Sequence, residues 1–313
     1  MKKTTLKDYL SEILNSEELS LVNRSFEIVG DIAICEIPNG LEKYDKEIGE
    51  ALLKVNKSIK VVLKKSGIHK GEFRTQDLIH IAGVDRKETI YRENGILLKI
   101  NPETVYFSSK LSTEREKLME KLKPNKRVLV MFSGSGPYSL VALRKQPNLA
   151  LIDSIEINPE GHKYALENLK LNKNIIKKSE EYINIISKLK EEKKYINEKE
   201  IIDSLINKKI HFYNGDVREI IDRELKNKKY DEIFMPLPKD AELFLDCAFK
   251  VADKNAIIHM YDFLHENEFP KKSENAIKDT AKKFEKEIKI IETRKVGQYS
   301  PRKFRVCCDF IVK

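Results

Sequence analysis

The chain lacks the features that mark membrane, secreted and metal-binding proteins. No apolar run approaches the roughly 18 residues that a membrane-spanning helix needs. The first residues, MKKTTLKDYLSEIL, contain no apolar secretory core and are typical of a polar amphipathic helix. The 4 cysteines show no metal-ligand spacing, so we expect reduced, partly buried thiols. These absences predict a cytoplasmic protein that has no metal site and does not bind a membrane.

Two nucleotide-binding signatures are also missing. A Gly-x-Gly turn is present at Gly134 and Gly136, but no third glycine follows at the offset of a dinucleotide fingerprint. A glycine-rich loop of the Walker type, with its lysine, is missing as well. Without the third glycine, the turn does not match the full dinucleotide-binding pattern. Without the Walker-type loop, ATP is not the expected ligand.

Basic residues are in excess, and they cluster. The 313-residue chain has 59 lysines and arginines against 50 acidic residues, a net charge of +9. Biased genome composition is an alternative explanation for part of this excess, so the clustering carries more weight than the total. Two clusters suit a polyanionic partner: the first is Lys64, Lys65, His69, Lys70 and Arg74, and the second is Arg294, Lys295, Arg302, Lys303 and Arg305.

The N-terminal third has the pattern of a small α+β domain. Apolar spacing predicts helices within 1–24 and 41–56, and strands within 25–38, 60–65 and 88–100. The segment 25–38 alternates around Gly30 like two short strands joined at a tight turn. Asn94 and Gly95 can take the positive φ values of a type I′ turn, which makes 88–100 the clearest hairpin. We predict that this domain covers residues 1–110.

The rest of the chain has the strand–helix alternation of a parallel sheet. A helix is expected at 111–123, where Thr113 followed by Glu116 is a capping-box signal. From residue 126 onward, strands and helices alternate as in βαβ units. We therefore predict an α/β domain over residues 111–313.

Two segments of this domain stand apart from the alternation. Residues 175–208 are rich in lysine and acids with apolar residues at helical spacing, and we interpret them as a helical insertion with a solvated face. The closing segment, 302–312, alternates in polarity and suits an antiparallel strand at the edge of the sheet.

Four short segments place special residues just after buried strands: 129–140, 154–172, 212–220 and 231–245. The first carries the Gly-x-Gly turn, the second an acid, the third a Gly-Asp pair and the fourth a Pro-rich turn. In an open α/β sheet, ligands bind just outside the carboxyl ends of the strands. This order resembles that of class I S-adenosylmethionine (AdoMet) methyltransferases. The resemblance implies a Rossmann-like, mostly parallel sheet whose last strand is antiparallel, preceded here by the small α+β domain.

Each of these motifs has a ligand-binding interpretation and a plain alternative. The missing Cβ atoms of Gly134 and Gly136 let the backbone pass close to a ligand, although the turn alone is weak support. Glu156 can accept two hydrogen bonds from ribose hydroxyls, or be an ordinary surface acid. Asp216 can accept the adenine amino group, or cap a helix. Together, the three motifs predict an adenosine-containing ligand.

Blocks along nearly the whole chain resemble one family. They include RSFEIVGDIAICEIP (24–38), KGEFRTQDLIHIAG (70–83) and MPLPKDAELFLD (235–246). The most specific is VYFSSKLSTERE (105–116), which has no counterpart in generic methyltransferases. The family is that of the archaeal and eukaryotic tRNA guanine-37 N1-methyltransferases, including the archaeal branch tied to wyosine synthesis. The resemblance implies methyl transfer from AdoMet to a base of the tRNA anticodon loop, and we expect a monomer.

The resemblance also implies roles for three residues. Arg74 matches the arginine assigned to the target guanine, Glu114 the carboxylate proposed as the base, and Arg115 an arginine near the cofactor. Guanine N1 carries a proton and its lone pair is committed to the ring, so N1 is a poor nucleophile toward a sulfonium methyl. A carboxylate that accepts this proton and a cation beside O6 would stabilise the developing enolate-like base. As alternatives, Glu114 is an acid favoured by the helix dipole and Arg74 is a surface cation.

The motifs, the resemblance and the basic clusters together define the predicted site. Catalysis is assigned to Glu114 and Arg74. The cofactor contacts are Arg115, Phe132, Gly134, Gly136, Glu156, Ile157, Asp216, Val217, Pro236 and Pro238. The tRNA contacts are Lys64, Lys65, Lys70, Tyr106, Lys110, Arg302, Lys303 and Arg305.

Two positions depart from the family pattern. Many relatives have Asp where Val130 stands, so the methionine end of the cofactor must find other polar partners. Many also have Asn where Pro236 stands, and the Pro form resembles the archaeal branch that also methylates the tricyclic wyosine precursor at C7. The chain starts close to its first family block, so we expect the N-terminal tRNA-binding domain of some relatives to be short or absent.

Two alternative functions stay open. One is transfer of the aminocarboxypropyl group of AdoMet to the wyosine precursor, although the MPLPK turn favours methyl transfer. The other is a catalytically silent RNA-binding protein that kept the fold. Val130 and Pro236 support this second alternative, whereas the intact Arg74, Glu114 and motif acids oppose it.

Overall fold

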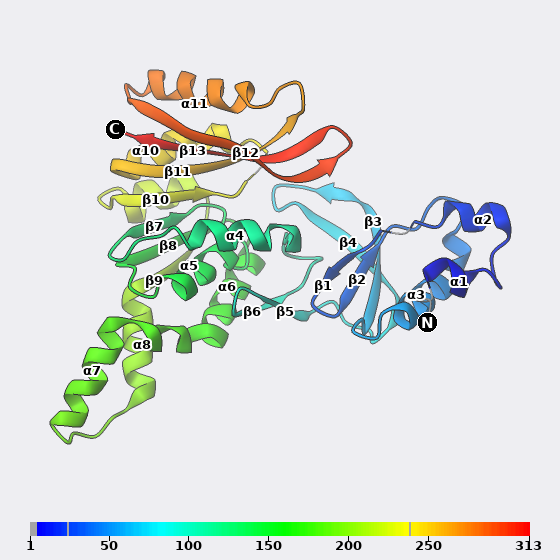
Figure 1. Ribbon diagram of the computed structural model, residues 1–313, viewed down its shortest axis with the longest axis horizontal. Helices are drawn as coiled ribbons and strands as arrows, with labels where there is room; N and C mark the ends of the chain where they lie inside the picture. Colours follow the sequence, from blue (N-terminus) through cyan, green and yellow to red (C-terminus); the bar gives the residue numbers. More distant parts are fainter. Residues whose placement is uncertain (1–4, 24, 238) are drawn as a thin grey trace. The chain divides into compact units, whose positions relative to one another are not determined.

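The computed structural model describes residues 5–23, 25–237 and 239–313, without the side chains of residues 68–70. The chain forms two compact units, coloured along the sequence in Figure 1. The first unit comprises Met1–Arg92 and Leu97–Ser109, and the second comprises Glu93–Ile96 and Lys110–Lys313. The division thus falls at Ser109 and Lys110, and the turn of one hairpin belongs to the second unit.

The first unit is built on a four-stranded sheet with strand order β1-β2-β3-β4. The strands are β1 (Glu27–Val29), β2 (Ile32–Cys35), β3 (Val61–Lys70) and β4 (Thr75–Gly83), and the helices are α1 (Leu6–Leu10), α2 (Ser16–Leu21), η1 (Glu42–Tyr44) and α3 (Asp45–Val55). Strands β2 and β3 run parallel, and α3 lies in the crossover connection that such a pair requires. The predicted strand pair around Gly30 is confirmed, since β1 and β2 are antiparallel neighbours.

Helix α3 holds the core of the first unit. Its Ile48 and Leu52 are buried with Val62 and Ala82 of the sheet, and burying such side chains contributes about 1.5–3 kcal/mol each. Gly49 lets the helix lie close to the sheet, because a Cβ at this position would come within 2.6 Å of the Ala82 Cβ. We therefore attribute the position of α3 to a glycine contact as well as to its apolar face.

The hairpin predicted at 88–100 is confirmed. Strands β5 (Thr89–Glu93) and β6 (Ile96–Ile100) form a two-stranded sheet. The turn residues have positive φ values, 46° at Asn94 and 77° at Gly95. The Asn94 side chain donates a hydrogen bond to the Ser112 carbonyl at 3.0 Å, which attaches the turn to the start of helix α4.

The second unit is built on a seven-stranded sheet with strand order β12-β13-β11-β10-β7-β8-β9. Its strands are β7 (Arg127–Val130), β8 (Leu151–Glu156), β9 (Ile210–Asn214), β10 (Tyr230–Met235), β11 (Ala252–His265), β12 (Ile288–Ser300) and β13 (Lys303–Val312). Neighbouring strands from β11 to β9 are parallel, whereas β13 is antiparallel to β11 and to β12. The predicted fold, a mostly parallel sheet with an antiparallel last strand, is confirmed.

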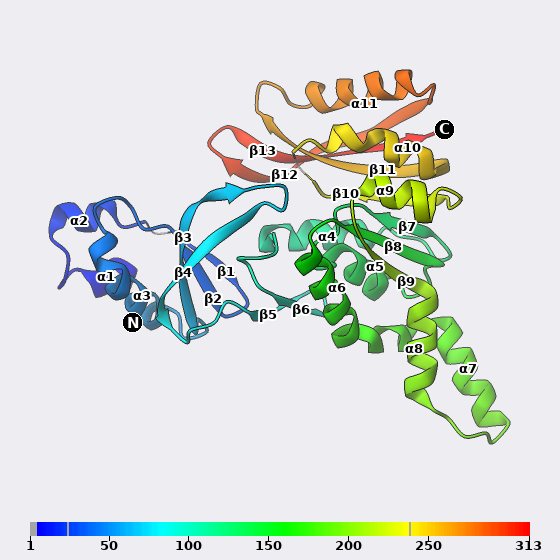
Figure 2. The ribbon, with the colours of Figure 1, turned by 180° about the vertical axis from the view of Figure 1, so that it is seen from behind.

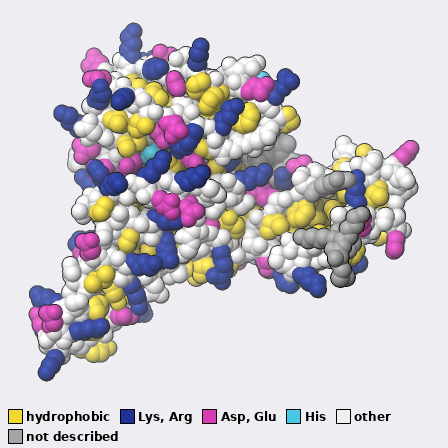
Figure 3. Space-filling view, in the orientation of Figure 1, with side chains coloured by type: hydrophobic (Ala, Val, Ile, Leu, Met, Phe, Trp, Pro, Cys, Tyr) yellow, Lys and Arg dark blue, Asp and Glu magenta, His cyan; other side chains and the backbone are white. Residues whose placement is uncertain are grey.

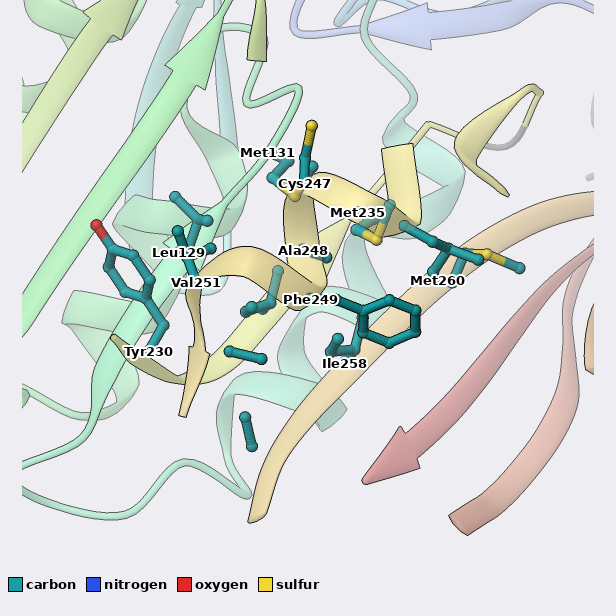
Figure 4. Close-up of a cluster of buried hydrophobic side chains, with 14 of the residues drawn as sticks. Leu129, Met131, Tyr230, Met235, Cys247, Ala248, Phe249, Val251, Ile258 and Met260 are labelled. Carbon is teal, nitrogen blue, oxygen red and sulfur yellow. The ribbon is translucent and has the colours of Figure 1, made fainter. Parts of the chain in front are cut away.

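The helices of this unit follow the strands in alternation. They are η2 (Ser109–Leu111), α4 (Ser112–Met119), α5 (Pro137–Lys145), α6 (Pro159–Asn172), η3 (Lys173–Lys178), α7 (Glu180–Glu191), α8 (Glu198–Lys209), α9 (Val217–Ile220), the π-helical turn η4 (Ile221–Leu225), η5 (Ala241–Phe244), α10 (Leu245–Val251) and α11 (Lys271–Lys283). Helices α5 and α10 bury apolar side chains against the sheet, and Figure 4 shows Cys247, Ala248 and Phe249 of α10 among Met235 and Ile258 of the strands.

The predicted helical insertion forms the helices α7 and α8, which project beyond β9 in Figures 1 and 2. Surface ion pairs join the two helices and η3, including Lys177 with Glu198 at 2.7 Å and Lys208 with Glu181 at 2.8 Å. Among the residues that the structure describes, no helix is both long and apolar enough to cross a bilayer.

The capping-box prediction at Thr113 is wrong. Helix α4 begins at Ser112, with Leu111 in the cap position and no side-chain capping bond. The reason is that the 3₁₀ turn η2 runs directly into α4, so the helix starts before Thr113 can cap it. Glu116 instead pairs with Lys145 at 2.6 Å, while Glu114 remains in the first helical turn.

The edge position predicted for the last strand is also wrong. Strand β13 lies between β11 and β12, and most of its residues are buried. The edge strand is β12, whose pairing with β13 is interrupted by three register shifts and whose side chains are mostly polar. Bulges and charged residues are the usual protection of an exposed strand edge, so β12 suits that place better than the cysteine-containing β13.

Candidate cofactor and catalytic site

The loop between β7 and α5 has the backbone that the sequence predicts for a ligand-binding turn. Three of its residues have positive φ values: 59° at Phe132, 56° at Gly134 and 85° at Gly136. Gly136 is the cap residue of α5 and Pro137 is its first helical residue, a position that proline favours. A Cβ at Gly136 would lie 3.1 Å from the Phe212 ring, so this turn has little room for any other residue.

Two serine hydroxyls in this loop are buried without a partner. Ser133 and Ser135 are 3% and 1% exposed, and neither Oγ atom has a hydrogen bond from the described residues. A buried hydroxyl without a partner costs free energy, typically about 1–3 kcal/mol, unless a ligand supplies the bond. The two hydroxyls therefore fit the polar groups of a ligand bound at the end of β7.

The Glu156 carboxylate at the end of β8 is fixed by backbone donors. Its Oε2 accepts a hydrogen bond from the Gly134 amide at 2.5 Å, and its Oε1 accepts one from the Asn158 amide at 2.8 Å. Burial raises the pKa of Glu156 above its usual value, although these amide bonds favour the ionised form. Each oxygen can accept a second bond, which the predicted contact of Glu156 with two ribose hydroxyls requires.

Asp216 follows β9 and acts as a helix cap. Its Oδ1 accepts a hydrogen bond from the Arg218 amide at 2.7 Å at the start of α9, which is the plain alternative noted above. The preceding Gly215 amide donates to the Glu156 carbonyl at 3.0 Å and so links the ends of β8 and β9. Ile157 is half-buried in the same region, whereas Val217 is 3% exposed and belongs to the core.

The end of β10 completes this edge of the sheet. Phe132 contacts the Phe244 ring edge-on at 4.9 Å, and the Arg218 guanidinium lies 4.0 Å over that ring. Pro236 directly follows β10 and is half-buried, whereas the predicted contact Pro238 lies outside the described residues. Val130 is fully buried and apolar, and the two serine hydroxyls are polar groups of the loop that follows it.

Glu114, the predicted base, lies in the first turn of α4 and is almost buried. Its side chain is 10% exposed, and its Oε1 accepts a hydrogen bond from Arg294 at 2.6 Å and one from the Tyr261 hydroxyl at 3.4 Å. No described residue donates to the other oxygen, Oε2. Glu114 therefore has one oxygen fixed by protein groups and one oxygen available as a proton acceptor.

Arg115, the next residue, points to a different partner. It is 1% exposed and forms a bidentate ion pair with Glu93, the last residue of β5 before the hairpin turn, with Nε 2.6 Å from Oε1. Its guanidinium also lies 5.7 Å from the Tyr138 ring. A buried charge of this kind requires such a partner, so Arg115 anchors the hairpin turn to α4. Its predicted contact with a cofactor stays a prediction.

Arg74 lies in the first unit, in the turn between β3 and β4. Its φ value is 52°, and its amide donates to the Gly71 carbonyl at 3.3 Å. A turn residue with positive φ presents its side chain from a tightly bent backbone, which suits recognition of a base. Its action together with Glu114 stays a prediction.

The basic residues predicted to contact RNA differ in their surroundings. Lys64 and Lys65 of β3 pair with Asp45 and Glu36, the second pair at 2.9 Å. Tyr106 is half-buried and Lys110 is exposed, while the Lys70 side chain lies outside the described part of the chain. Figure 3 shows basic and acidic side chains intermingled on the face drawn there, so net charge alone does not define an RNA surface.

The turn between β12 and β13 combines cations with aromatic rings. Arg302 is 75% exposed and Lys303 lies 6.0 Å from the rings of both Phe263 and Tyr299. Tyr299 is 58% exposed, and its ring centroid is 4.2 Å from that of Phe263. Arg305 is only 8% exposed, and its guanidinium lies 5.3 Å from the Phe263 ring. It therefore packs beneath the exposed residues of the β12–β13 turn.

Sequence reasoning missed several residues of the site. Ser133 and Ser135 flank Gly134, and hydroxyls beside a ligand-binding glycine were the available signal. The sequence places Arg294 in a basic cluster, whereas the structure pairs it with Glu114 and Asp309. The available signal for this group of buried charges is the presence of His259 and Asp309 within the mostly apolar segments 256–261 and 306–312.

Comparison with known proteins identifies the family of this fold and site. A model of the TRM5/TYW2 methyltransferase domain matches residues 89–205 and 183–291, and a model of the TYW2 N-terminal domain matches residues 6–86. The chain belongs to the TRM5/TYW2 methyltransferase family. Its second unit is therefore the methyltransferase domain, and the predicted fold class and family are both confirmed.

Three relatives illustrate how similar this TRM5/TYW2 protein is to others. The tRNA (guanine(37)-N(1))-methyltransferase Trm5b of Pyrococcus abyssi is 36% identical over 92% of the chain and 74% of its own length. The tRNA (guanine(37)-N(1))/4-demethylwyosine(37)-methyltransferase Taw22 of Nanoarchaeum equitans is 33% identical over 90% of the chain and 97% of its own length. A structure of aTrm5 in complex with tRNALeu has a TM-score of 0.77 at 30% identity, covering 100% of this chain and 79% of the other.

Proposed function

We propose that this protein transfers a methyl group from AdoMet to N1 of guanine 37 in tRNA. The observation that carries the proposal is the edge formed by the ends of β7, β8 and β9, where Glu156 and two unpaired serine hydroxyls surround a glycine turn. The names of the relatives at 36% and 33% identity agree with this substrate. AdoMet bound at this edge supplies an electrophilic methyl group on a sulfonium.

In this proposal, different residues bind the cofactor, accept the proton and stabilise the developing charge. Glu156 holds the ribose hydroxyls, and Asp216 accepts from the adenine amino group. The Ser133 and Ser135 hydroxyls can accept as well as donate hydrogen bonds, so they can replace the acid missing at Val130. Glu114 accepts the N1 proton on its Oε2, and the Arg74 cation stabilises the negative charge that develops on O6. The base must leave its stack in the anticodon loop to reach these groups.

We also propose a second activity, methylation of the tricyclic wyosine precursor at C7. Pro236 in place of the more usual Asn favours this, and the Nanoarchaeum relative is named for both reactions. The deciding experiment uses labelled AdoMet with two tRNAs, one bearing guanine 37 and one bearing 4-demethylwyosine, followed by identification of the nucleosides. Label in 1-methylguanosine supports the main proposal, an aminocarboxypropyl product contradicts it, and no product indicates a silent RNA-binding protein.

Substitution of Glu156 by Ala should weaken AdoMet binding about tenfold or more. Hydrogen bonds to a charged group contribute roughly 1.5–3 kcal/mol, and the variant removes the acceptor of two ribose hydroxyls. Isothermal calorimetry measures the affinity. Glu160→Ala is the matched control and should bind normally, because the half-exposed Glu160 side chain at the start of α6 pairs with Lys163 at 3.5 Å. An unchanged affinity in Glu156→Ala would remove Glu156 from the site.

The affinity for tRNA should fall steeply as salt increases, because phosphate neutralisation releases counterions. Replacing both Arg302 and Lys303 by Gln should reduce the slope of log affinity against log salt by roughly 1.4–1.8, the value for two phosphate contacts. The control is the exposed pair Lys282 and Lys283 at the end of α11, whose replacement removes the same charge from the same unit. Equal slopes in the two double variants would show that the β12–β13 turn does not contact phosphates.

A further inference from the structure

A buried row of alternating charges leads through the sheet to Glu114. It runs across neighbouring strands: Glu232 on β10, His259 on β11, Asp309 on β13 and Arg294 on β12. His259 Nε2 is 2.9 Å from Glu232 Oε2, and His259 Nδ1 is 2.8 Å from Asp309 Oδ1. Arg294 then bridges two carboxylates, with Nη1 bonded to Asp309 Oδ2 and Nη2 2.6 Å from Glu114 Oε1.

Both ring nitrogens of His259 face carboxylate oxygens, so the imidazole must donate from both and carry a positive charge. Burial alone would lower the pKa of His259, but the hydrogen bonds to Asp309 and Glu232 raise it to about 9. The Phe234 ring stacks on the imidazole with centroids 4.4 Å apart. The grouping His259, Cys307 and Asp309 has donor atoms within 4.8 Å of one another, as metal ligands do, but an imidazolium has no lone pair to offer a metal.

The charges in this row sum to a value that depends on Glu114. Three carboxylates, those of Glu232, Asp309 and Glu114, face two cations, His259 and Arg294, so the sum is −1 when Glu114 is ionised. When Glu114 takes up a proton, the sum is zero. All five side chains are at least four-fifths buried, so each charge depends on the opposite charges that the row places beside it.

The other titratable groups near Glu114 do not change this sum. Tyr261 of β11, Tyr138 of α5 and Cys307 of β13 are fully buried, and burial raises the pKa of each, so all three stay neutral. The neighbouring Arg115 is neutralised by Glu93. Glu292 on β12 is exposed and lies 3.7 Å from Arg294, outside the buried row.

We propose that Arg294 is a positioning residue for methyl transfer, which holds the Glu114 carboxylate by Oε1 and leaves Oε2 to accept the proton. In the step, the N1–H bond of guanine breaks and an O–H bond forms on Oε2, while the methyl group moves from sulfur to N1 and S-adenosylhomocysteine leaves. The proton is later released to water. A free glutamate side chain has three rotatable bonds, and fixing one oxygen through the Asp309–His259–Glu232 row removes that freedom before the substrate binds. This inference rests on the proposed role of Glu114 as the base.

The test compares single-turnover rates of methyl transfer across pH for Arg294→Gln, Arg294→Lys and Glu114→Gln, with tRNA bearing guanine 37. Arg294→Gln should lower the rate at least tenfold and should shift the acid limb of the pH profile upward by about one unit or more, because loss of a nearby cation raises the pKa of a carboxylate. Arg294→Lys keeps the charge and should restore the pH profile, but only part of the rate, because an ammonium cannot bridge two carboxylates as the guanidinium does. Arg223→Gln, at an exposed arginine of the same unit, is the control and should match the wild-type protein.

The outcomes separate this inference from the proposed function. Normal turnover by Glu114→Gln would overturn Glu114 as the base, and the inference with it. A slow Glu114→Gln with a normal Arg294→Gln would overturn the inference alone. If Arg294→Gln lowers the rate by the same factor at every pH, the shape of its pH profile is unchanged. Arg294 would then have a purely structural role, and the inference would also be overturned. Circular dichroism checks whether Arg294→Gln is folded. If it is not, the double variant that combines Arg294→Lys with Glu114→Gln decides. Rate losses that add up in the double variant overturn the inference, and a rate no lower than that of Glu114→Gln alone supports it.

Discussion

Replacing Glu114 by Gln should lower the single-turnover rate of methyl transfer by roughly 10²–10⁴-fold, the usual contribution of a positioned general base. Glutamine keeps the size of the side chain and can still accept a hydrogen bond from Arg294 and Tyr261, the two donors to the Glu114 carboxylate. It cannot take up the N1 proton, so the loss should fall on the chemical step. Rapid-quench measurement with saturating AdoMet and tRNA isolates that step from binding and product release.

The control for this variant lies on the same helix. Glu116 is two residues further along α4 and pairs with Lys145 on the surface, so Glu116→Gln should retain the wild-type rate. AdoMet affinity should be unchanged in both variants. Normal single-turnover chemistry in Glu114→Gln would place the base elsewhere and leave Glu114 as a partner of Arg294 and an acid at the start of α4.

Replacing Arg74 by Ala should lower the rate at least as much as Glu114→Gln does. The arginine is expected both to stabilise the charge on guanine O6 and to position the base, and removal of one donor to a developing oxyanion typically costs roughly 10²–10³-fold in rate. AdoMet binding should survive, because Arg74 belongs to the first unit and Glu156 to the second. The measurement is again single turnover, combined with calorimetry for the cofactor.

A substrate change tests the same role from the other side. Adenine has a free lone pair on N1 and no O6, so discrimination against a tRNA with adenine 37 should weaken in Arg74→Ala. Arg92→Ala, at an exposed arginine of the first unit, is the control for general charge loss. A rate within twofold of wild type in Arg74→Ala would return Arg74 to the status of a surface cation.

The motifs at the strand ends were predictable because they depend on local chemistry. Gly136 and Pro137 specify a turn into a helix through their own φ preferences, and Glu156 ends a buried strand. The order of such segments then places them at one sheet edge, since parallel strands bring their carboxyl ends together. The turn at Asn94 and Gly95 was predictable for the same reason.

The order of the last two strands was not predictable in this way. The segment 302–312 alternates like an edge strand, but β13 lies inside the sheet because β12 pairs along its outer side. The residues of 302–312 do not indicate whether another strand will pair with the outer side of this segment. The helix start at Ser112 was missed for a related reason, since a preceding 3₁₀ turn replaced the cap that Thr113 would otherwise provide.

The family, the mostly parallel α/β fold and the acids and glycines of the cofactor edge could be predicted from the sequence, because each is indicated by motifs whose residues lie close together in the chain. The surroundings of Glu114 instead depend on how the strands are ordered in the folded sheet. Arg294 is 180 residues away in sequence and has the appearance of one cation in a basic cluster, yet its guanidinium reaches Glu114 and Asp309. A buried charge is stabilised by whichever opposite charge the fold brings within hydrogen-bond distance, and that partner is chosen by strand order rather than by spacing along the chain.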